Sequence, residues 1–431
     1  MSNSAEREFC TPKRILVVSQ HYWPESFRIT DICNSFVERG YDVEVLCGIP
    51  NYPEGQFYDG YGITKNRRQV VNGIKIRRCF EIKRGNNSGF RIFLNYISFP
   101  ISSLFSLPYL LRQKYDKIFL FQTSPVMMTL AGILLGKLKK IETIMYVLDL
   151  WPENLYSVLK IEGRLSRKYL QRISKWYYCN ADKLIANTQK LQSLLSNRTG
   201  KEKSKITYIP QFCEKVYEAS DVDKELTTRY AGTFNMVFAG NISPAQSFET
   251  VIDAAKIIIK EEGIDDLNWI IIGDGMSRKW FENEVKKEGL SDNFVFIGHI
   301  PMEEIPKYTQ IADVLFACLT KSEMLDCALP GKVLSYYAAG RPLILAMDGE
   351  VQQIVRSSGA GYVVDSLDYK GFADAVVKLY KATKQERIQM GKNAKDYYFQ
   401  YFERNMNVEK LIGFIFDDGG QLGHGTGCHS D

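Results

Sequence analysis

A strand–loop–helix–strand rhythm runs through the chain twice, and this repetition constrains the fold more than any other feature of the sequence. In the first run, a short apolar strand at 14–19 is followed by a polar loop, a helix at 29–39 and a strand at 42–46. The rhythm restarts with a strand at 235–239, after a polar stretch without periodicity. Such alternation is typical of parallel sheets covered by helices, so the sequence predicts an α/β chain with two doubly wound, Rossmann-like domains.

The predicted division of the chain follows these two runs. We expect an N-terminal domain at 1–213, a linker at 214–232, a second domain at 233–389, C-terminal helices at 390–416 that pack back on the first domain, and a disordered Gly-rich tail at 417–431. No CxxC pair or Cys/His ligand spacing occurs among the nine cysteines, which is typical of a reduced, cytoplasmic protein.

The charge of the chain is unevenly distributed. The first 215 residues carry 33 Lys and Arg against 18 Asp and Glu, a net charge of +15, and the remainder carries −10. A basic half joined to an acidic half suggests that only the first half meets an anionic surface. Nucleic acid and anionic lipid are both candidates for that surface on charge alone.

A mostly apolar and aromatic run occupies 90–111 and has basic residues on both sides. A transmembrane helix would need about 20 predominantly apolar residues, and this run is interrupted by an asparagine, four serines and two prolines. We therefore do not interpret it as a membrane span. It is either a helix packed on the sheet or a helix lying in the membrane interface, and the two interpretations are compatible.

Polar residues follow several strands of the first run, where ligands of doubly wound sheets bind. The loop after the first strand carries His21, Trp23, Glu25 and Arg28, and an aromatic, Gly- and Pro-rich loop at 47–62 begins after the second. For His21, hydrogen bonds that only tie the loop are as good an explanation as catalysis. Asp149 and Glu153 follow the strand at 143–148 and could hold a reacting hydroxyl, unless Asp149 merely caps the next helix.

The stretch ALPGKVLSYYAAGRPLIL at 328–345 combines a turn, a helix and a short strand. Leu329, Pro330 and Gly331 form the predicted turn, and the helix begins at Lys332. A helix N-terminus presents free N–H groups and the positive end of its dipole, so it suits a phosphate, and Lys332 adds a full charge. The alternative is an ordinary loop–helix–strand unit.

Small or polar loops also follow the strands predicted at 235–239, 269–272 and 293–297. The first contains Gly240 and Asn241, the second is Gly273-Asp274-Gly275, and the third begins with Gly298-His299-Ile300. We interpret the recurrence of glycine at strand ends as a sign that backbone approaches a ligand closely.

Taken together, these motifs resemble the GT-B glycosyltransferases of family four, which are retaining enzymes. Within that family the sequence is similar to the WbuB-like bacterial enzymes of surface-polysaccharide synthesis. The resemblance covers about 13–415 and is carried by HYWPESFRITD (21–31), PNYPEGQFYDGY (50–61), DLWPEN (149–154), FAGNISPAQ (238–246), GDG (273–275), FIGHIP (296–301) and LPGK with AAGRPLI near 329–344. It implies two facing Rossmann-like domains with a cleft between them.

The resemblance also implies roles for individual residues. The catalytic candidates are Asp149, Glu153 and Lys332. The acceptor side would include His21, Trp23, Glu25, Arg28, Asn51 and Tyr52. The donor nucleotide sugar would be bound by Gly240, Asn241, Gln246, Gly273, Asp274, Gly275, Gly298, His299, Ile300, Glu323, Asp326, Leu329, Pro330, Gly331, Lys332 and Ser335. Similar enzymes bind no metal and no other cofactor.

The sequence departs from the family pattern at several of these positions. Two glutamates that the family carries in its last motif align with Cys327 and Ser335, so Glu323 or Asp326 would have to substitute for them. An arginine and a lysine common after the first strand of the second domain fall near Asn241 and Gln246. A common acceptor-side histidine aligns with Asp149.

The implied activity is that of a retaining, hexosyltransferase-type enzyme. It would move a sugar, such as an N-acetylated deoxy-amino sugar like N-acetyl-fucosamine, from a UDP-sugar to a polyprenyl-diphosphate-linked acceptor in O-antigen or capsule synthesis. The expected location is the inner face of the bacterial plasma membrane, bound peripherally through the basic half to anionic lipid rather than to nucleic acid. Two alternatives stay open: a nucleotide-sugar 2-epimerase, or an inactive nucleotide-sugar-binding partner.

Overall fold

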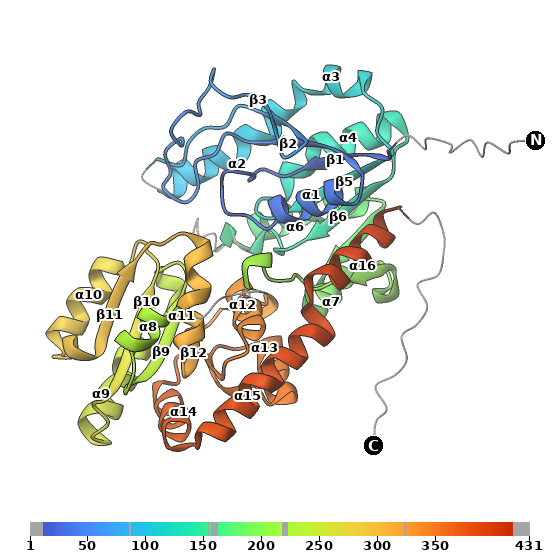
Figure 1. Cartoon of the computed structure of the whole chain (residues 1–431). Coiled ribbons are helices and arrows are strands. Elements are labelled where there is room, and N and C mark those ends of the chain that lie inside the picture. Colours follow the sequence, from blue (N-terminus) through green and yellow to red (C-terminus); the bar gives the residue numbers. More distant parts are fainter. Residues whose placement is uncertain are drawn as a thin grey trace, which may run out of the picture. The chain divides into compact units, whose positions relative to one another are not determined.

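The computed structural model describes residues 12–85, 88–153, 155–156, 163–217, 223–322 and 325–416. It confirms the predicted fold class, because two Rossmann-like sheets alternate with helices along the chain (Figure 1). The tail at 417–431 and Glu323 lie outside the described residues, as does Asn154 of the DLWPEN motif.

The first sheet has the strand order β3-β4-β2-β1-β5-β6-β7-β8. Its strands are β1 (Arg14–Val18), β2 (Asp42–Cys47), β3 (Arg68–Val71), β4 (Ile74–Arg78), β5 (Lys117–Gln122), β6 (Thr143–Val147), β7 (Lys183–Ala186) and β8 (Ile206–Tyr208). The helices along this part of the chain are α1 (Ile29–Glu38), α2 (Gly89–Leu104), α3 (Leu107–Arg112), α4 (Leu130–Lys139), α6 (Arg164–Asn180) and α7 (Gln189–Thr199). Strand β1 runs parallel to β2 and β5, whereas β3 is antiparallel to β4.

The second sheet is parallel throughout, in the order β11-β10-β9-β12-β13-β14. Its strands are β9 (Phe234–Ala239), β10 (Leu267–Ile272), β11 (Phe294–Gly298), β12 (Val314–Cys318), β13 (Leu343–Ala346) and β14 (Gly361–Val364). The helices here are α8 (Lys224–Arg229), α9 (Phe248–Lys256), α10 (Arg278–Lys287), α11 (Ile305–Ile311), α12 (Gly331–Ala339), α13 (Glu350–Ser358), α14 (Tyr369–Lys381), α15 (Lys384–Tyr397) and α16 (Arg404–Phe416).

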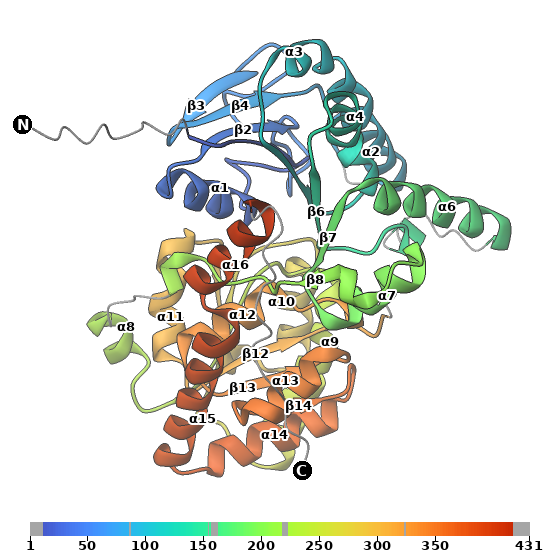
Figure 2. The same cartoon turned by 90° about the vertical axis from the view of Figure 1, so that its right-hand side faces the viewer.

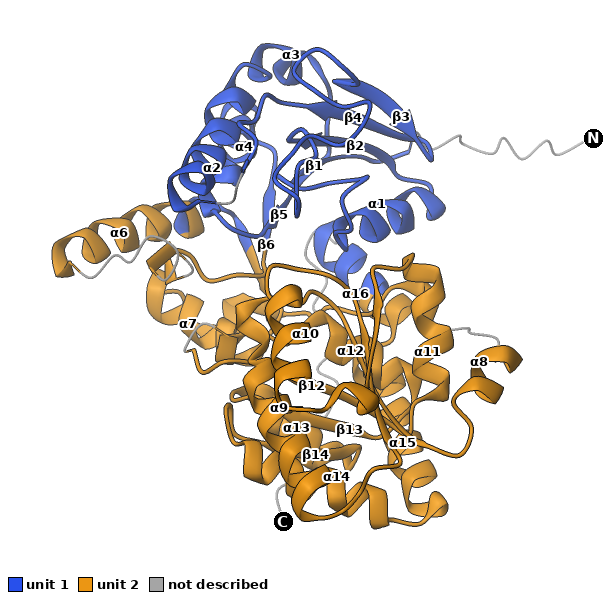
Figure 3. Cartoon of the chain, turned by 90° about the vertical axis from the view of Figure 1, so that its left-hand side faces the viewer, with its two compact units in different colours: residues 1–146, 179–183, 408–431 blue, residues 147–178, 184–407 orange. Residues whose placement is uncertain are grey.

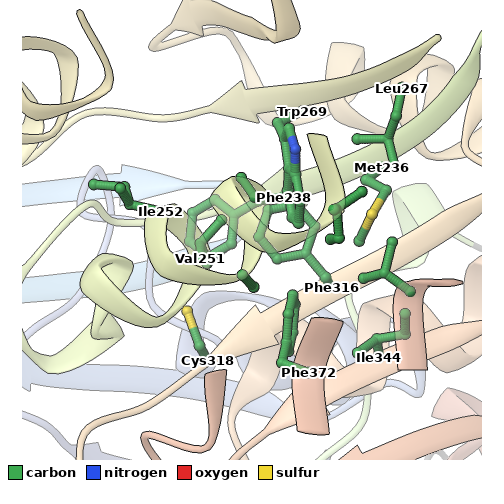
Figure 4. Close-up of a cluster of buried hydrophobic side chains, with 14 of the residues drawn as sticks. Met236, Phe238, Val251, Ile252, Leu267, Trp269, Phe316, Cys318, Ile344 and Phe372 are labelled. Carbon is green, nitrogen blue, oxygen red and sulfur yellow. The ribbon is translucent and has the colours of Figure 1, made fainter. Parts of the chain in front are cut away.

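An aromatic core fixes the strands that carry the loops of the second sheet. Trp269 of β10 packs edge-on against Phe316 of β12, with ring centroids 5.2 Å apart, and Phe238 of β9 and Phe372 of α14 lie beside them (Figure 4). All four side chains are buried. Burial of large aromatic side chains dominates core energetics, so the strand ends are held on a rigid base.

The chain divides into two compact units (Figure 3). Unit 1 comprises residues 1–146, 179–183 and 408–431, and unit 2 comprises 147–178 and 184–407. The end of α16 belongs to unit 1, where Phe416 stacks on Tyr41 at 4.3 Å and Glu409 pairs with Arg39 at 2.6 Å. Helix α8 occupies part of the stretch interpreted as a linker, and the domain limits drawn from the sequence stay predictions.

The apolar run at 90–111 forms α2 and α3. The buried face of α2 carries several polar residues. Its polar residues face inward: Asn95 and Ser103 are fully buried and Ser98 is almost so. Phe99 is also buried, but other large apolar residues face outward, with Phe90 69% exposed, Ile101 53% and Phe105, just beyond the helix, 83%. By length and composition alone, the stretch Gly89–Arg112 could cross a membrane.

The inward face of α2 is tied by hydrogen bonds to the segment after β4. The Ser98 hydroxyl accepts from the Ile82 N–H at 2.9 Å, and the Ser102 hydroxyl donates to the Phe80 carbonyl at 2.5 Å. The polar residues that argued against a membrane span therefore fix the helix to unit 1. The helix is therefore packed on unit 1 and still presents apolar residues to solvent, and its place in a membrane interface stays a prediction.

Candidate functional site

Four of the residues predicted on the acceptor side meet in one buried cluster of unit 1. Glu25 accepts hydrogen bonds from the backbone N–H groups of Asn51 and Tyr52, at 2.6 and 2.7 Å. Its other carboxylate oxygen lies 2.8 Å from Nδ1 of His21. His21, Glu25 and Asn51 are all buried, so the loop after β1 and the loop after β2 are joined at the carboxyl ends of their strands.

Arg84 extends this cluster and was missed from the sequence. Its Nη2 lies 3.3 Å from Nε2 of His21, and its guanidinium lies over the Tyr52 ring at 4.9 Å. Because guanidinium only donates, Nε2 of His21 must accept and Nδ1 must carry the proton that Glu25 accepts. The lone pair of His21 is thus engaged by Arg84, which favours the interpretation of His21 as a residue that ties the loops.

Glu81 and Asn95 complete the cluster from the segment after β4 and from α2. Glu81 Oε1 accepts from Asn95 Nδ2 at 2.5 Å, from Gln20 Nε2 at 2.8 Å and from Asn51 Nδ2 at 3.2 Å. Burial raises the pKa of Glu81 to about 7. A Cβ at Gly48 would overlap Glu81 Oε2, so this glycine leaves room for the carboxyl group.

Trp23 and Arg28 lie apart from these hydrogen bonds. The Trp23 carbonyl accepts from Nη2 of Arg78 at 3.0 Å, and its ring packs edge-on to Tyr61. Arg28 lies at the start of α1. Their acceptor-side roles stay predictions.

In unit 2, α12 begins where the sequence places it and its first turn is open to an anion. Pro330 precedes the helix, no side chain of the described residues caps its N-terminus, and its first turn contains no acidic residue. Lys332 Nζ donates to Gln246 Oε1 at 2.6 Å and lies 4.0 Å from the centre of the Phe238 ring. Three predicted donor-binding elements therefore meet, since a Cβ at Gly240 would lie only 2.9 Å from Lys332 Nζ.

Burial lowers the pKa of Lys332 to about 7, and the neighbouring Cys318 only weakly opposes this shift. No carboxylate lies among the groups that shift its pKa. The ammonium form of Lys332 is therefore costly in the free protein and would be stabilised by an anionic ligand.

The glycines after β9, β10 and β11 have a different cause from the one inferred from the sequence. A Cβ at Gly273 would overlap the Gly240 carbonyl oxygen, and one at Gly275 would overlap the Ile242 carbonyl oxygen. The Gly273 N–H also donates to the Gly298 carbonyl at 2.8 Å. Close packing of neighbouring loops therefore requires glycine at 273 and 275, and the approach of a ligand to these loops stays a prediction.

The same packing leaves three predicted donor side chains exposed on adjacent loops. Asn241, Asp274 and His299 follow β9, β10 and β11 respectively. Arg278, at the start of α10, pairs with Asp274 at 3.2 Å and lies against Gly298. It is a cation at this edge that the sequence reasoning did not include.

The predicted donor residues in α12 and in the loop before it make contacts within unit 2. The Ser335 hydroxyl turns back to the Gly331 carbonyl at 3.4 Å, and Ser335 is 5% exposed. The Asp326 backbone packs so closely on residue 349 that only glycine fits there. The Cys327 carbonyl accepts from the Thr188 hydroxyl at 2.7 Å. The roles of Asp326, Ser335, Leu329 and Ile300 toward the donor stay predictions.

Asp149 and Glu153 have different surroundings. Glu153 is paired with Arg198 at 2.5 Å. Burial raises the pKa of Asp149 to about 6. Arg198 also donates to the Trp151 carbonyl at 3.2 Å, so Glu153 belongs to a contact that fixes its own loop. Of the two, Asp149 is the better candidate to exchange a proton near neutral pH.

A pocket of about 320 Å³ opens beside α9, and Lys332 is not among the residues that line it. Its lining includes the carboxylates of Glu249 and Asp253, which would repel a diphosphate. Among the described residues, no group of three His, Cys, Asp or Glu side chains is arranged to hold a metal ion, and the expectation of a metal-free enzyme stays a prediction.

Two family models match successive parts of this chain. Residues 27–214 match "Glycosyltransferase Family 4" and residues 221–397 match "Glycosyl transferases group 1". The chain belongs to the GT-B glycosyltransferases of group 1. As a member, it is an enzyme that transfers a glycosyl group.

Among curated relatives, the glycosyltransferase is 24% identical over 304 residues to "Probable glycosyltransferase WbjE" of Pseudomonas aeruginosa, covering 68% of this chain and 73% of the relative. It is 25% identical to the "GDP-mannose-dependent alpha-(1-6)-phosphatidylinositol monomannoside mannosyltransferase" of Mycobacterium tuberculosis, covering 42% of this chain and 47% of the relative. Its fold matches Anabaena HepE, solved with UDP, at 14% identity and a TM-score of 0.68, over 94% of this chain and 99% of HepE.

Proposed function

We propose that this glycosyltransferase moves a sugar from a UDP-sugar to a polyprenyl-diphosphate-linked acceptor. The observation that carries the proposal is that helix α2 exposes large apolar side chains on one face, while Asn95 on its buried face hydrogen-bonds to Glu81 of the buried cluster. An exposed apolar face beside polar loops suits a substrate with an apolar tail and a polar head. The acceptor's isoprenoid chain would lie on α2, and its head would meet the loops that Glu25 joins.

On the donor side, the proposal assigns the diphosphate to the start of α12 and to Lys332. The uncapped N–H groups and the lysine supply positive charge where the leaving diphosphate gains negative charge. HepE has been solved with UDP and with UDP-glucose, which favours UDP. The mycobacterial relative is named as GDP-mannose-dependent, so the base is a point for experiment.

We infer a retaining mechanism with front-face attack. The bond between the anomeric carbon and the phosphate oxygen breaks, the acceptor oxygen bonds to the same face of that carbon, and the acceptor's proton passes to the departing phosphate. This route needs no protein base. It fits a chain in which Arg198 pairs with Glu153 and in which no carboxylate nucleophile has been assigned on the donor loops.

We also propose that the enzyme acts in bacterial O-antigen or capsule synthesis and is bound peripherally to the inner face of the plasma membrane. An N-acetylated deoxy-amino sugar such as N-acetyl-fucosamine is the proposed donor sugar, because the sequence resembles the WbuB-like enzymes.

One assay distinguishes the proposal from its alternatives. Purified enzyme is incubated with a panel of UDP- and GDP-sugars, with or without polyprenyl-diphosphate-linked sugars of long and short chain. We expect nucleotide release that depends on the acceptor, and product whose anomeric configuration, read by NMR, is retained. Interconversion of donor sugars without acceptor would instead identify a 2-epimerase. Donor binding without turnover would identify an inactive partner, which the loss of both family glutamates at Cys327 and Ser335 makes a reasonable alternative.

The α2 face gives a second readout in the same assay. A triple variant, Phe90→Ser, Ile101→Ser and Phe105→Ser, should raise KM for the long-chain acceptor at least about tenfold, since each buried CH₂ contributes about 0.8 kcal/mol. KM for the short-chain acceptor should stay within about twofold. Equal KM values of the variant and wild type for the long chain would remove α2 from the acceptor site.

Donor binding should also depend on pH. Above about pH 7 Lys332 is largely neutral in the free enzyme, so binding UDP as an anion must take up a proton. We expect the Kd for UDP, measured by calorimetry, to rise by up to about tenfold per pH unit between about pH 7.5 and 9. A Lys332→Met variant should bind more weakly with little pH dependence; a wild-type Kd that does not change with pH would contradict the assignment.

A further inference from the structure

Helix α6 presents an exposed apolar stripe that neither the fold nor the catalytic proposal uses. Leu165, Tyr169 and Trp176 are 84%, 66% and 43% exposed. Their spacing of four and seven residues places them on one face of the helix. Large apolar side chains aligned on a solvent-facing helix mark a surface that meets a partner.

The charges of α6 are all of one sign. The helix contains no acidic residue. Its five basic residues are all exposed: Arg164, Arg167, Lys168, Arg172 and Lys175. At 100° per residue, Arg172 lies at the edge of the apolar stripe, Arg164, Lys168 and Lys175 lie on one side of it, and Arg167 lies opposite to it. A solvated helix gains stability from mixed charges along its face, and α6 lacks them.

The helix is held at its C-terminal end and extends from there. Ser174, Tyr177 and Tyr178 are its buried residues. The Ser174 hydroxyl accepts from Arg198 at 2.7 Å, and the Tyr178 hydroxyl accepts from the Trp151 N–H at 3.1 Å. Figures 2 and 3 show its N-terminal half projecting beyond the other ribbons of unit 2, where the Tyr156 hydroxyl donates to the Arg167 carbonyl at 3.2 Å. The apolar stripe and most of the cations therefore lie on a part of the helix open to a partner.

We propose that α6 is a docking helix for anionic lipid headgroups. The tyrosine and tryptophan are the side chains that favour the interface between headgroups and acyl chains, and the cations match the charge of acidic lipids. A second copy of this chain is a poor occupant, because two α6 helices would bring ten cations together without a carboxylate between them. The inference rests on the proposed lipid-linked acceptor and names the surface that meets the membrane carrying it.

Flotation with vesicles tests the role of α6. Full-length enzyme is mixed with vesicles of phosphatidylcholine alone or with a third of phosphatidylglycerol, at about 0.1 M and about 0.5 M salt. We expect wild-type enzyme to float with the anionic vesicles at low salt and to be released at high salt. The triple variant Lys168→Gln, Arg172→Gln and Lys175→Gln should bind at least about tenfold more weakly, because each cation contributes about a factor of five. Leu165→Ser with Tyr169→Ser should weaken binding by a similar factor.

The matched control removes the same charge elsewhere. Lys370, Lys378 and Lys384 are exposed lysines around α14 and α15 of unit 2, and their triple change to Gln should leave flotation within about twofold of wild type. Turnover with the short-chain acceptor reports on the site itself and should be unchanged in every α6 variant. Circular dichroism confirms that each variant is folded.

Several results would overturn the role of α6. Flotation of folded α6 variants at the wild-type level would do so while leaving the lipid-linked acceptor untouched. Loss of short-chain turnover in these variants would place α6 in the acceptor site instead. A dimer that α6 variants convert to monomer, with vesicle binding unchanged, would identify a second copy as its partner.

Discussion

Replacing Lys332 with Ala should lower kcat/KM at least about tenfold, which corresponds to about 1.4 kcal/mol of transition-state stabilisation. The reason is the local shortage of positive charge. The positions where family four carries an arginine and a lysine fall near Asn241 and Gln246, and Gln246 accepts a hydrogen bond from Lys332. Lys332 therefore supplies side-chain charge at the start of α12 that the neighbouring loop does not.

The measurement is steady-state kinetics with the donor and acceptor identified by the panel assay. Lys332→Met retains the length of the side chain over the Phe238 ring and removes the charge, so it should lose nearly as much activity as the Ala variant. Lys279→Ala removes an exposed lysine on α10 and should change kcat/KM by less than about twofold. Wild-type kinetics in both Lys332 variants would remove this residue from the site.

The order of strands and helices could be read from the sequence because apolar runs alternate regularly with amphipathic ones. The hairpin of β3 and β4 was missed, since its strands carry several charged residues and lie at the edge of the sheet. Its turn residues, Asn72 and Gly73, both have positive φ, and an Asn-Gly pair between short strands is a strong hairpin signal. That signal could have located β4.

Because β4 was not predicted, the residues that follow it could not be assigned to the polar cluster of unit 1. Glu81 and Arg84 follow β4, so without that strand nothing placed them beside His21 and Glu25. Asn95 was noticed only as an interruption of an apolar run, because hydropathy does not say which face of a helix is buried. The start of α12 was predictable since its turn, helix and lysine are adjacent in sequence, whereas two of the three partners of Glu25 come from the separate loop after β2.

Replacing Glu25 with Ala should destabilise the protein by about 3 kcal/mol or more. Three donors point at this buried carboxylate: the Asn51 and Tyr52 N–H groups and, by the tautomer argument, Nδ1 of His21. Removing the Glu25 carboxylate leaves these three donors without an acceptor. It also removes the negative charge to which Arg84 is linked by way of His21. Buried donors and charges that lose their partners carry penalties of this size.

A Glu25→Gln variant retains the volume of the side chain and changes only its charge and its hydrogen-bonding groups. The Gln carbonyl can still accept from the two backbone N–H groups, but its amide must then donate to Nδ1 of His21. His21 would have to carry its proton on Nε2, where Arg84 Nη2 lies 3.3 Å away and also donates. Two donors would face each other, so we expect a loss of about 1 to 3 kcal/mol in a variant that has almost the same volume as wild type.

Urea unfolding followed by circular dichroism and by tryptophan fluorescence measures both variants. Glu54→Gln changes an exposed glutamate in the loop joined by Glu25 and should shift the free energy of unfolding by less than about 0.5 kcal/mol. If Glu25→Gln were as stable as Glu54→Gln, the direction of hydrogen bonding from Arg84 through His21 to Glu25 would be wrong. His21 would then be free to exchange a proton, and the catalytic role set aside for it would have to be reconsidered.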